Sequence, residues 1–181
     1  MINEKILCAR MKEAYKYGGY WVFIYTGRVM LWTGGWAVQM PCSKLPRKAL
    51  GLLVEHMAKI PAEGEAYWVN KNNDQLMLAE KAREFWDKVE LPVEEQRPVS
   101  RTPLTYGGMP LWQIPETKQI LAFDPERAAL IEPGKAEDIY TDGDALYARF
   151  DNILAAIWRM KVENEIITAL ERGRWYEDDG L

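Results

Sequence analysis

The sequence has 181 residues, of which 48% are hydrophobic and 12% aromatic, so the chain can bury a sizeable core. It contains no apolar run of about 18 residues, which excludes an ordinary transmembrane helix, and its first residues lack the basic and then apolar composition of a secretory signal. We therefore expect a folded cytoplasmic protein without a membrane partner.

The net charge of −4 conceals an uneven distribution of the 23 basic and 27 acidic residues. Residues 1–60 hold nine Lys and Arg against three acids, a balance of +6, so the other 121 residues hold 14 basic against 24 acidic side chains, a balance of −10. A basic first third followed by an acidic remainder can mark a surface that faces a polyanion.

Residues 1–60 predict an antiparallel sheet with two helices. Residues 2–17 repeat apolar side chains at helical spacing and end at Gly18. Three antiparallel strands separated by turns are predicted next, over residues 20–26, 29–33 and 36–40. Residues 46–60 predict a second amphipathic helix, with Pro46 at its first position. Both helices carry lysine on the side opposite their apolar stripe, so we expect them to cover the sheet and to face solvent with lysine.

Residues 65–90 predict a hairpin followed by a helix. An aromatic strand over 65–70 and an apolar return over 75–79 flank a polar turn, and residues 79–90 have the composition of a solvated helix. Residues 91–117 contain five prolines, which predicts a linker or an extended crossing segment.

The C-terminal part predicts a small second element and a long helix. Residues 118–123 form a short predicted strand, and Asp124 is suited to cap a helix start. Farther on, side chains alternate spacings of four and three over about three heptad repeats. This seam consists of Leu146, Phe150, Ile153, Ile157, Met160, Asn164 and Ile167. It predicts either an interface between helices, with Asn164 fixing the register, or one amphipathic helix packed on its own domain.

No residue pattern typical of an enzyme or a metal centre is present. His56 is the single histidine, and no nucleophile elbow or triad context accompanies it, so a structural role is expected. Cys8 and Cys42 lack zinc-ligand spacing, and Asp142 and Asp144 lack the spacing of a calcium loop. Phosphate-binding glycine loops are also missing from the sequence. We expect a protein without catalytic residues, metal or cofactor.

Lysine on the two N-terminal helices is the most functional-looking feature. The candidate nucleic-acid-binding residues are Lys5, Lys12, Lys16, Lys44, Arg47, Lys48 and Lys59. If both helices cover the same side of the sheet, these cations can contact phosphates together, with a salt-dependent and sequence-independent affinity. The alternative is that the two helices simply have ordinary solvated faces.

Residues 36–79 follow an order of elements found in a known family. The relevant segments are Met40-Pro41, Leu45-Pro46-Arg47-Lys48-Ala49-Leu50, Leu53-Val54 and Ile60-Pro61-Ala62-Glu63-Gly64-Glu65. This strand, helix and hairpin resemble a subdomain of the bacterial DNA sliding clamp. The resemblance implies a non-enzymatic protein that tethers a polymerase to its template, with Lys and Arg on inner helices facing DNA. Clamp subdomains occur in tandem, whereas no second copy is evident after residue 90, so a ring would need several chains.

The sequence thus predicts an α+β protein with an antiparallel sheet covered by two helices and a long C-terminal helix. Its expected parts are a sheet unit over residues 1–90, a proline-rich segment over 91–117 and a small second element with the long helix over 118–181. The leading hypothesis is an oligomeric, clamp-like binding protein that contacts nucleic acid. A protein–protein interaction module that uses the long helix and the aromatic linker is the alternative, and a small-ligand site lined by Tyr and Trp is a third option.

Overall fold

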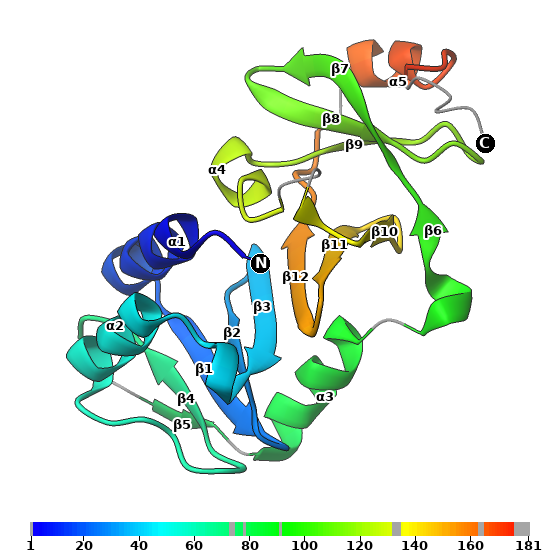
Figure 1. Cartoon of the computed structure of the whole chain (residues 1–181). Helices are drawn as coiled ribbons and strands as arrows, with labels where there is room; N and C mark the ends of the chain where they lie inside the picture. Colours follow the sequence, from blue (N-terminus) through cyan, green and yellow to red (C-terminus); the bar gives the residue numbers. More distant parts are fainter. Residues whose placement is uncertain are drawn as a thin grey trace.

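The computed structural model describes residues 2–72, 75–77, 79–90, 92–131, 135–162 and 165–175. These residues form a mixed α/β fold built on a nine-stranded antiparallel sheet and a three-stranded sheet (Figure 1). In order across the large sheet, the strands are β5 (Gln75–Met77), β4 (Ala66–Val69), β1 (Tyr20–Tyr25), β2 (Arg28–Trp32), β3 (Trp36–Pro41), β12 (Ile153–Trp158), β11 (Ala145–Phe150), β10 (Asp138–Thr141) and β6 (Arg97–Pro98). The small sheet has the order β7 (Ser100–Tyr106), β8 (Met109–Gln113) and β9 (Ile120–Ala122).

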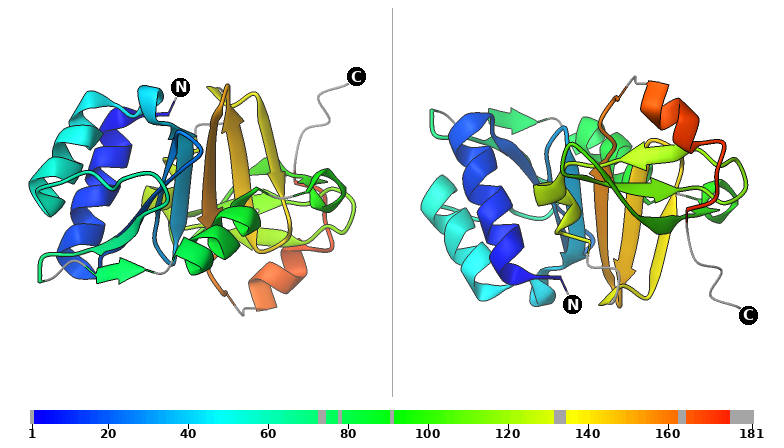
Figure 2. Two further views of the ribbon diagram at one scale, coloured as in Figure 1. Left: turned by 90° about the horizontal axis from the view of Figure 1, so that it is seen from below. Right: turned by 90° about the horizontal axis from the view of Figure 1, so that it is seen from above.

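Helices cover both faces of the large sheet. The helices of the described residues are α1 (Glu4–Tyr17), α2 (Arg47–Met57), α3 (Ala79–Val89), α4 (Pro125–Ala128) and α5 (Glu165–Leu170), with single 3₁₀ turns η1 (Cys42–Lys44) and η2 (Val93–Glu95). Figure 2 shows α1 and α2 side by side on one side of the sheet, with α3 on the other.

Tight turns set the register of two hairpins. The turn between β1 and β2 has positive φ at both central residues, 50° at Thr26 and 70° at Gly27, and the turn between β7 and β8 repeats this at Gly107 and Gly108. Two consecutive residues with positive φ match the right-handed twist of the flanking strands.

Alternating side chains of the central strands supply two cores. In β1, Tyr20 packs with Leu7 of α1 and Leu53 of α2, whereas Phe23 packs on the opposite face with Trp86 of α3. All five side chains are at most 4% exposed. The outward sides of α1 and α2 therefore share one surface of the molecule, and α3 belongs to the other.

Strand β12 joins the C-terminal part of the chain to the N-terminal sheet. It pairs antiparallel with β3, with Ala155 opposite Val38 and Ala156 opposite Ala37. The antiparallel sheet was predicted, but it is larger than expected because it runs across the predicted boundaries at residues 90 and 117.

The proline-rich segment over residues 91–117 contains strands. Pro98 lies in β6, a two-residue strand at the edge of the large sheet. At an edge, the missing backbone N–H of proline does not remove a hydrogen bond between inner strands. Pro103 lies where the register of β7 against β8 shifts, between Arg101 and Thr105. These two prolines therefore occupy edge and irregular positions that a sheet tolerates, whereas Pro110 lies in the central strand β8, opposite Thr105.

The prediction of a long C-terminal helix is wrong. Residues 145–158 form the hairpin of β11 and β12, and the only helix described after it is the six-residue α5. A spacing of four residues fits one helical turn but also two strand repeats, so Leu146 and Phe150 share one side of β11. The spacing of three between Phe150 and Ile153 spans the turn at Asp151 and Asn152. Asn164 lies outside the described residues.

The small sheet lies between the main core and α5. Trp112 and Leu121 join the core beneath α1 and α2, whereas Leu111 and Ile120 face the other way and pack with Ile167 of α5. None of the helices described in the structure has the length and apolarity needed to cross a membrane.

Candidate nucleic-acid interface

Helix α1 begins with a side-chain cap. The Asn3 side-chain oxygen accepts hydrogen bonds from the backbone N–H groups of Lys5 and Ile6, at 3.1 and 3.3 Å. Leu7 and Met11 are fully buried beneath the helix, which turns its opposite side to solvent. That exposed side carries the three lysines expected there, Lys5, Lys12 and Lys16.

Contacts at both ends fix α2 alongside α1. At the first turn of α2, the backbone N–H of Lys48 donates to the carboxylate of Glu4 at 3.1 Å. At the last turn, the ring of His56 stacks on Tyr15 with a centroid distance of 3.8 Å and an interplanar angle of 4°. The Tyr20 hydroxyl lies 2.9 Å from His56 Nδ1. Because N-terminal turn meets N-terminal turn and C-terminal turn meets C-terminal turn, the two helices run parallel.

This pairing places Lys48 of α2 beside the lysines of α1. Burial is the main cause that raises the pKa of the Cys8 thiol, and the Glu4 carboxylate raises it further, whereas the ammonium groups of Lys12 and Lys48 lower it. Lys12 and Lys48 are therefore both close to this one thiol, at the junction of the two helices. We call Lys5, Lys12, Lys16 and Lys48 the lysine face.

Acidic neighbours of the lysine face are partly engaged elsewhere. Glu4 caps α2, and Glu13 pairs at 2.5 Å with Arg10, which also pairs with Glu126 of α4. Glu55 remains exposed on α2. Among the described residues, no carboxylate lies within ion-pair distance of the four lysines of this face. Its local charge is therefore positive although the chain is acidic.

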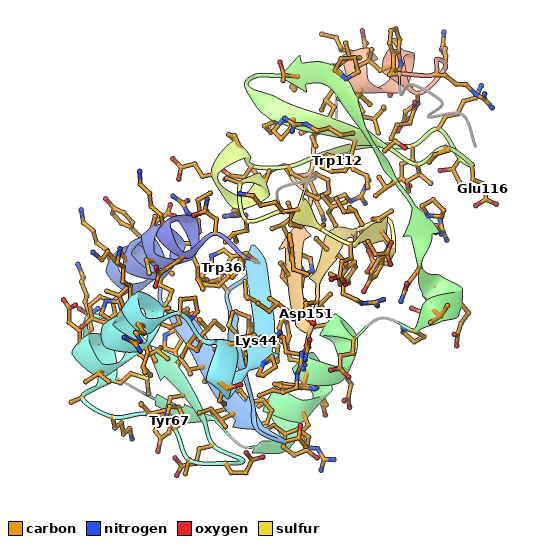
Figure 3. The ribbon with its side chains drawn as sticks, viewed as in Figure 1. Trp36, Lys44, Tyr67, Trp112, Glu116 and Asp151 are labelled. Atoms are coloured by element: carbon orange, nitrogen blue, oxygen red, sulfur yellow. The ribbon has the colours of Figure 1, made fainter. Side chains whose placement is uncertain are left out.

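The remaining cations of the predicted set lie in other settings. Lys44 forms an ion pair with Asp151 in the turn between β11 and β12, and Figure 3 shows these two side chains together. Lys59 follows the end of α2, and its Nζ lies 3.6 Å from the centre of the Tyr67 ring. Arg47 is exposed at the first residue of α2. The structure brings together four of the seven predicted cations and gives Lys44 and Lys59 separate partners.

The predicted assembly residues do not form an exposed surface. Leu146, Phe150, Ile153 and Ile157 are at most 3% exposed and belong to the main core. Met160 is 40% exposed after the end of β12, and Ile167 packs α5 on the small sheet. The hypothesis of an interface along a long heptad helix is therefore wrong.

One feature was not found from the sequence. On the α3 side of the large sheet, a groove is formed by residues from α3, η2, the turn between β10 and β11, and the end of β12. These segments are far apart in the chain and carry no shared motif, so only the fold assembles them. We call it the aromatic groove, because Phe85, Tyr147 and Trp158 line it.

Comparison of the chain with family models, with curated proteins and with solved structures gave no match. The fold and the candidate site define the protein as a mixed α/β protein in which the paired helices α1 and α2 expose the lysine face. The resemblance of residues 36–79 to a clamp subdomain stays a prediction.

Proposed function

We propose that the protein is a non-enzymatic, cytoplasmic binding protein that contacts nucleic acid through the lysine face. The parallel pairing of α1 and α2 supports this proposal, because it gathers cations from two helices on one surface. Neither helix alone would present more than a single row. The resemblance of residues 36–79 to a clamp subdomain agrees with it, and the assembly of several copies around a duplex is part of the same proposal.

The expected contact is electrostatic and independent of base sequence. Each lysine that neutralises a phosphate releases condensed counterions, so the logarithm of affinity falls with the logarithm of salt concentration by about 0.9 per contact on B-form DNA. Four lysines therefore predict a slope of at most about −3.6 and an affinity in the micromolar range or weaker at physiological salt. The negative charge of the rest of the chain keeps the binding weak.

Neutralising the lysine face is expected to weaken DNA binding. The double variant Lys12→Gln with Lys48→Gln removes two phosphate contacts, so the salt slope should fall by about 1.8 and the affinity at low salt by about tenfold or more. Fluorescence anisotropy of a labelled 20-base-pair duplex, titrated from 20 to 200 mM salt, measures both quantities.

The matched control is Lys44→Gln with Lys59→Gln. It changes the net charge equally, but its lysines contact Asp151 and Tyr67 and are not part of the lysine face. Equal effects of the two double variants, or no retention of DNA by the unmodified protein at 20 mM salt, would exclude the lysine face as the binding surface.

Cys8 reports on occupancy of the same surface. Because the pKa of its thiol is raised, labelling by iodoacetamide near pH 8 is slow. As long as the pH is below that pKa, the labelling rate should rise about tenfold for each unit of increasing pH. Bound DNA should slow Cys8 labelling several-fold, because it covers the thiol and offsets the two lysines that lower the pKa. Peptide mapping by mass spectrometry follows each cysteine separately.

Cys42 is the internal control for this measurement. Its backbone N–H donates to the carbonyl of Gly27 at 3.0 Å, which places it by the turn between β1 and β2. Labelling of Cys42 should not respond to DNA. Protection of Cys42 with continued labelling of Cys8 would place the bound DNA elsewhere.

A further inference from the structure

The aromatic groove is large enough for a small ligand. It has a volume of about 870 Å³, within the range of ligand-binding clefts. Phe85 and Asp87 come from α3, Glu95 from η2, and Trp158 from the end of β12. The groove opens on the side of the sheet covered by α3, away from α1 and α2.

Stacked rings form one wall of the groove. The ring of Trp158 lies 6.0 Å from that of Phe85, and Phe85 stacks on Trp32 at 4.8 Å with an interplanar angle of 14°. Trp32 is buried, whereas Phe85 and Trp158 are half-buried, so the row of rings begins in the core and reaches the groove. Aromatic faces of this kind attract cations.

A fixed carboxylate, Asp142, also lines the groove. One oxygen of Asp142 accepts the backbone N–H groups of Asp144 and Ala145, both at 2.7 Å, and the other accepts the Tyr147 hydroxyl at 2.9 Å. Burial, and then the Asp142 carboxylate, raise the pKa of Tyr147 well above its usual value, so the hydroxyl keeps its proton and holds Asp142 in place.

The charges of the groove favour a cation. Four carboxylates line it, against Arg159 and Lys161. Arg159 is paired with Asp144 at 2.8 Å, whereas no cation among the described residues pairs with Asp87 or Glu95. The carboxylates of Asp87 and Glu95 are therefore available to a bound cation beside the aromatic wall.

We propose that the aromatic groove binds a guanidinium group carried by a small ligand. A planar guanidinium stacks on Trp158 or Phe85 while its N–H groups donate to Asp87 or Glu95, a combination that a compact ammonium matches less well. This site is independent of the lysine face, which lies on the other side of the sheet and carries the opposite charge.

Two ligands of nearly equal shape test the proposal. N-acetylarginine methylamide carries the guanidinium, and N-acetylcitrulline methylamide replaces it with a neutral urea. Calorimetric titration of the full chain at low salt should detect the arginine compound and show at least about tenfold weaker binding of the citrulline compound. The same titration with putrescine compares a diammonium with the guanidinium and should give the weaker affinity.

Variants locate the binding. Asp87→Asn with Glu95→Gln should weaken the arginine compound about tenfold, and Trp158→Ala by a similar factor. Glu84→Gln is the control, because Glu84 is exposed on the same helix but is not part of the groove. The exposed acid pair can be replaced without opening the core, so the test does not depend on Trp158→Ala folding. No binding at millimolar concentration, equal binding of the neutral compound, or an unchanged affinity in the acid double variant would overturn the proposal.

Discussion

Replacement of Ile157 by aspartate is expected to unfold the protein. Ile157 is fully buried in β12, where it lies opposite Trp36 of β3 and Leu146 of β11. Loss of its apolar side chain alone should cost about 2–5 kcal/mol, and burial of an unpaired carboxylate adds several more. The sum is comparable with the whole free energy of unfolding of a domain, about 5–15 kcal/mol. Circular dichroism with urea denaturation measures the loss.

Met160→Asp is the matched control for this experiment. Met160 belongs to the same predicted heptad seam, but it is 40% exposed and lies beyond the end of β12. Its aspartate remains in water, so the free energy of unfolding should change by no more than about 1 kcal/mol. If the seam lay on an exposed helix, Ile157→Asp and Met160→Asp would have similar effects. Both variants would stay folded and would lose self-association. A folded Ile157→Asp variant would therefore contradict the hairpin.

Local signals predicted much of the N-terminal half correctly. Glycine at the turns, proline before α2 and the period of the apolar residues place α1, β1 to β3, α2 and the hairpin of β4 and β5 within a few residues of their observed bounds. Each of these features depends on residues near one another in the chain. The pairing of β3 with β12 has no such signal, because strands that pair across more than 100 residues are matched only by the folded core.

Periodicity failed where two periods coincide. From Leu146 to Phe150, and again from Ile153 to Ile157, a spacing of four fits both a helix and a strand, so the pattern cannot tell them apart. The run at residues 153–158 is apolar at every position, as expected for a strand buried on both faces. In the sequence, that run and the Asp-Asn pair before it were the signals for a hairpin. In the structure, Asp151 of this turn has φ of 57°.

The candidate sites show the same division between local and tertiary information. The exposed lysines of α1 could be predicted, because helical spacing alone determines which side of a helix is apolar. Their closeness to Lys48 depends on Glu4 capping α2 and on Tyr15 stacking with His56. The partner that removes Lys44 from the lysine face, Asp151, lies 107 residues away.

Gly19→Ala is expected to destabilise the fold by about 2–6 kcal/mol, because it combines two costs of roughly 1–3 kcal/mol each. The first is the backbone, since Gly19 has φ of +112°, which side chains rarely allow. The second is space, because a Cβ at this position would lie 2.5 Å from Cε2 of Trp68 on β4. The chain turns here from α1 into β1, so neither segment can move freely to relieve the contact.

Gly18→Ala supplies the comparison from the adjacent residue. Gly18 has φ of −156°, and an added Cβ would meet nothing within 4 Å, so its free energy of unfolding should change by less than about 1 kcal/mol. Thermal and urea denaturation of both variants test the difference. In a Trp68→Ala background the clash disappears and the backbone cost stays, so Gly19→Ala should then cost about 1–3 kcal/mol. Equal costs of the two glycine substitutions would mean that neither the positive φ of Gly19 nor its contact with Trp68 constrains the entry into the sheet.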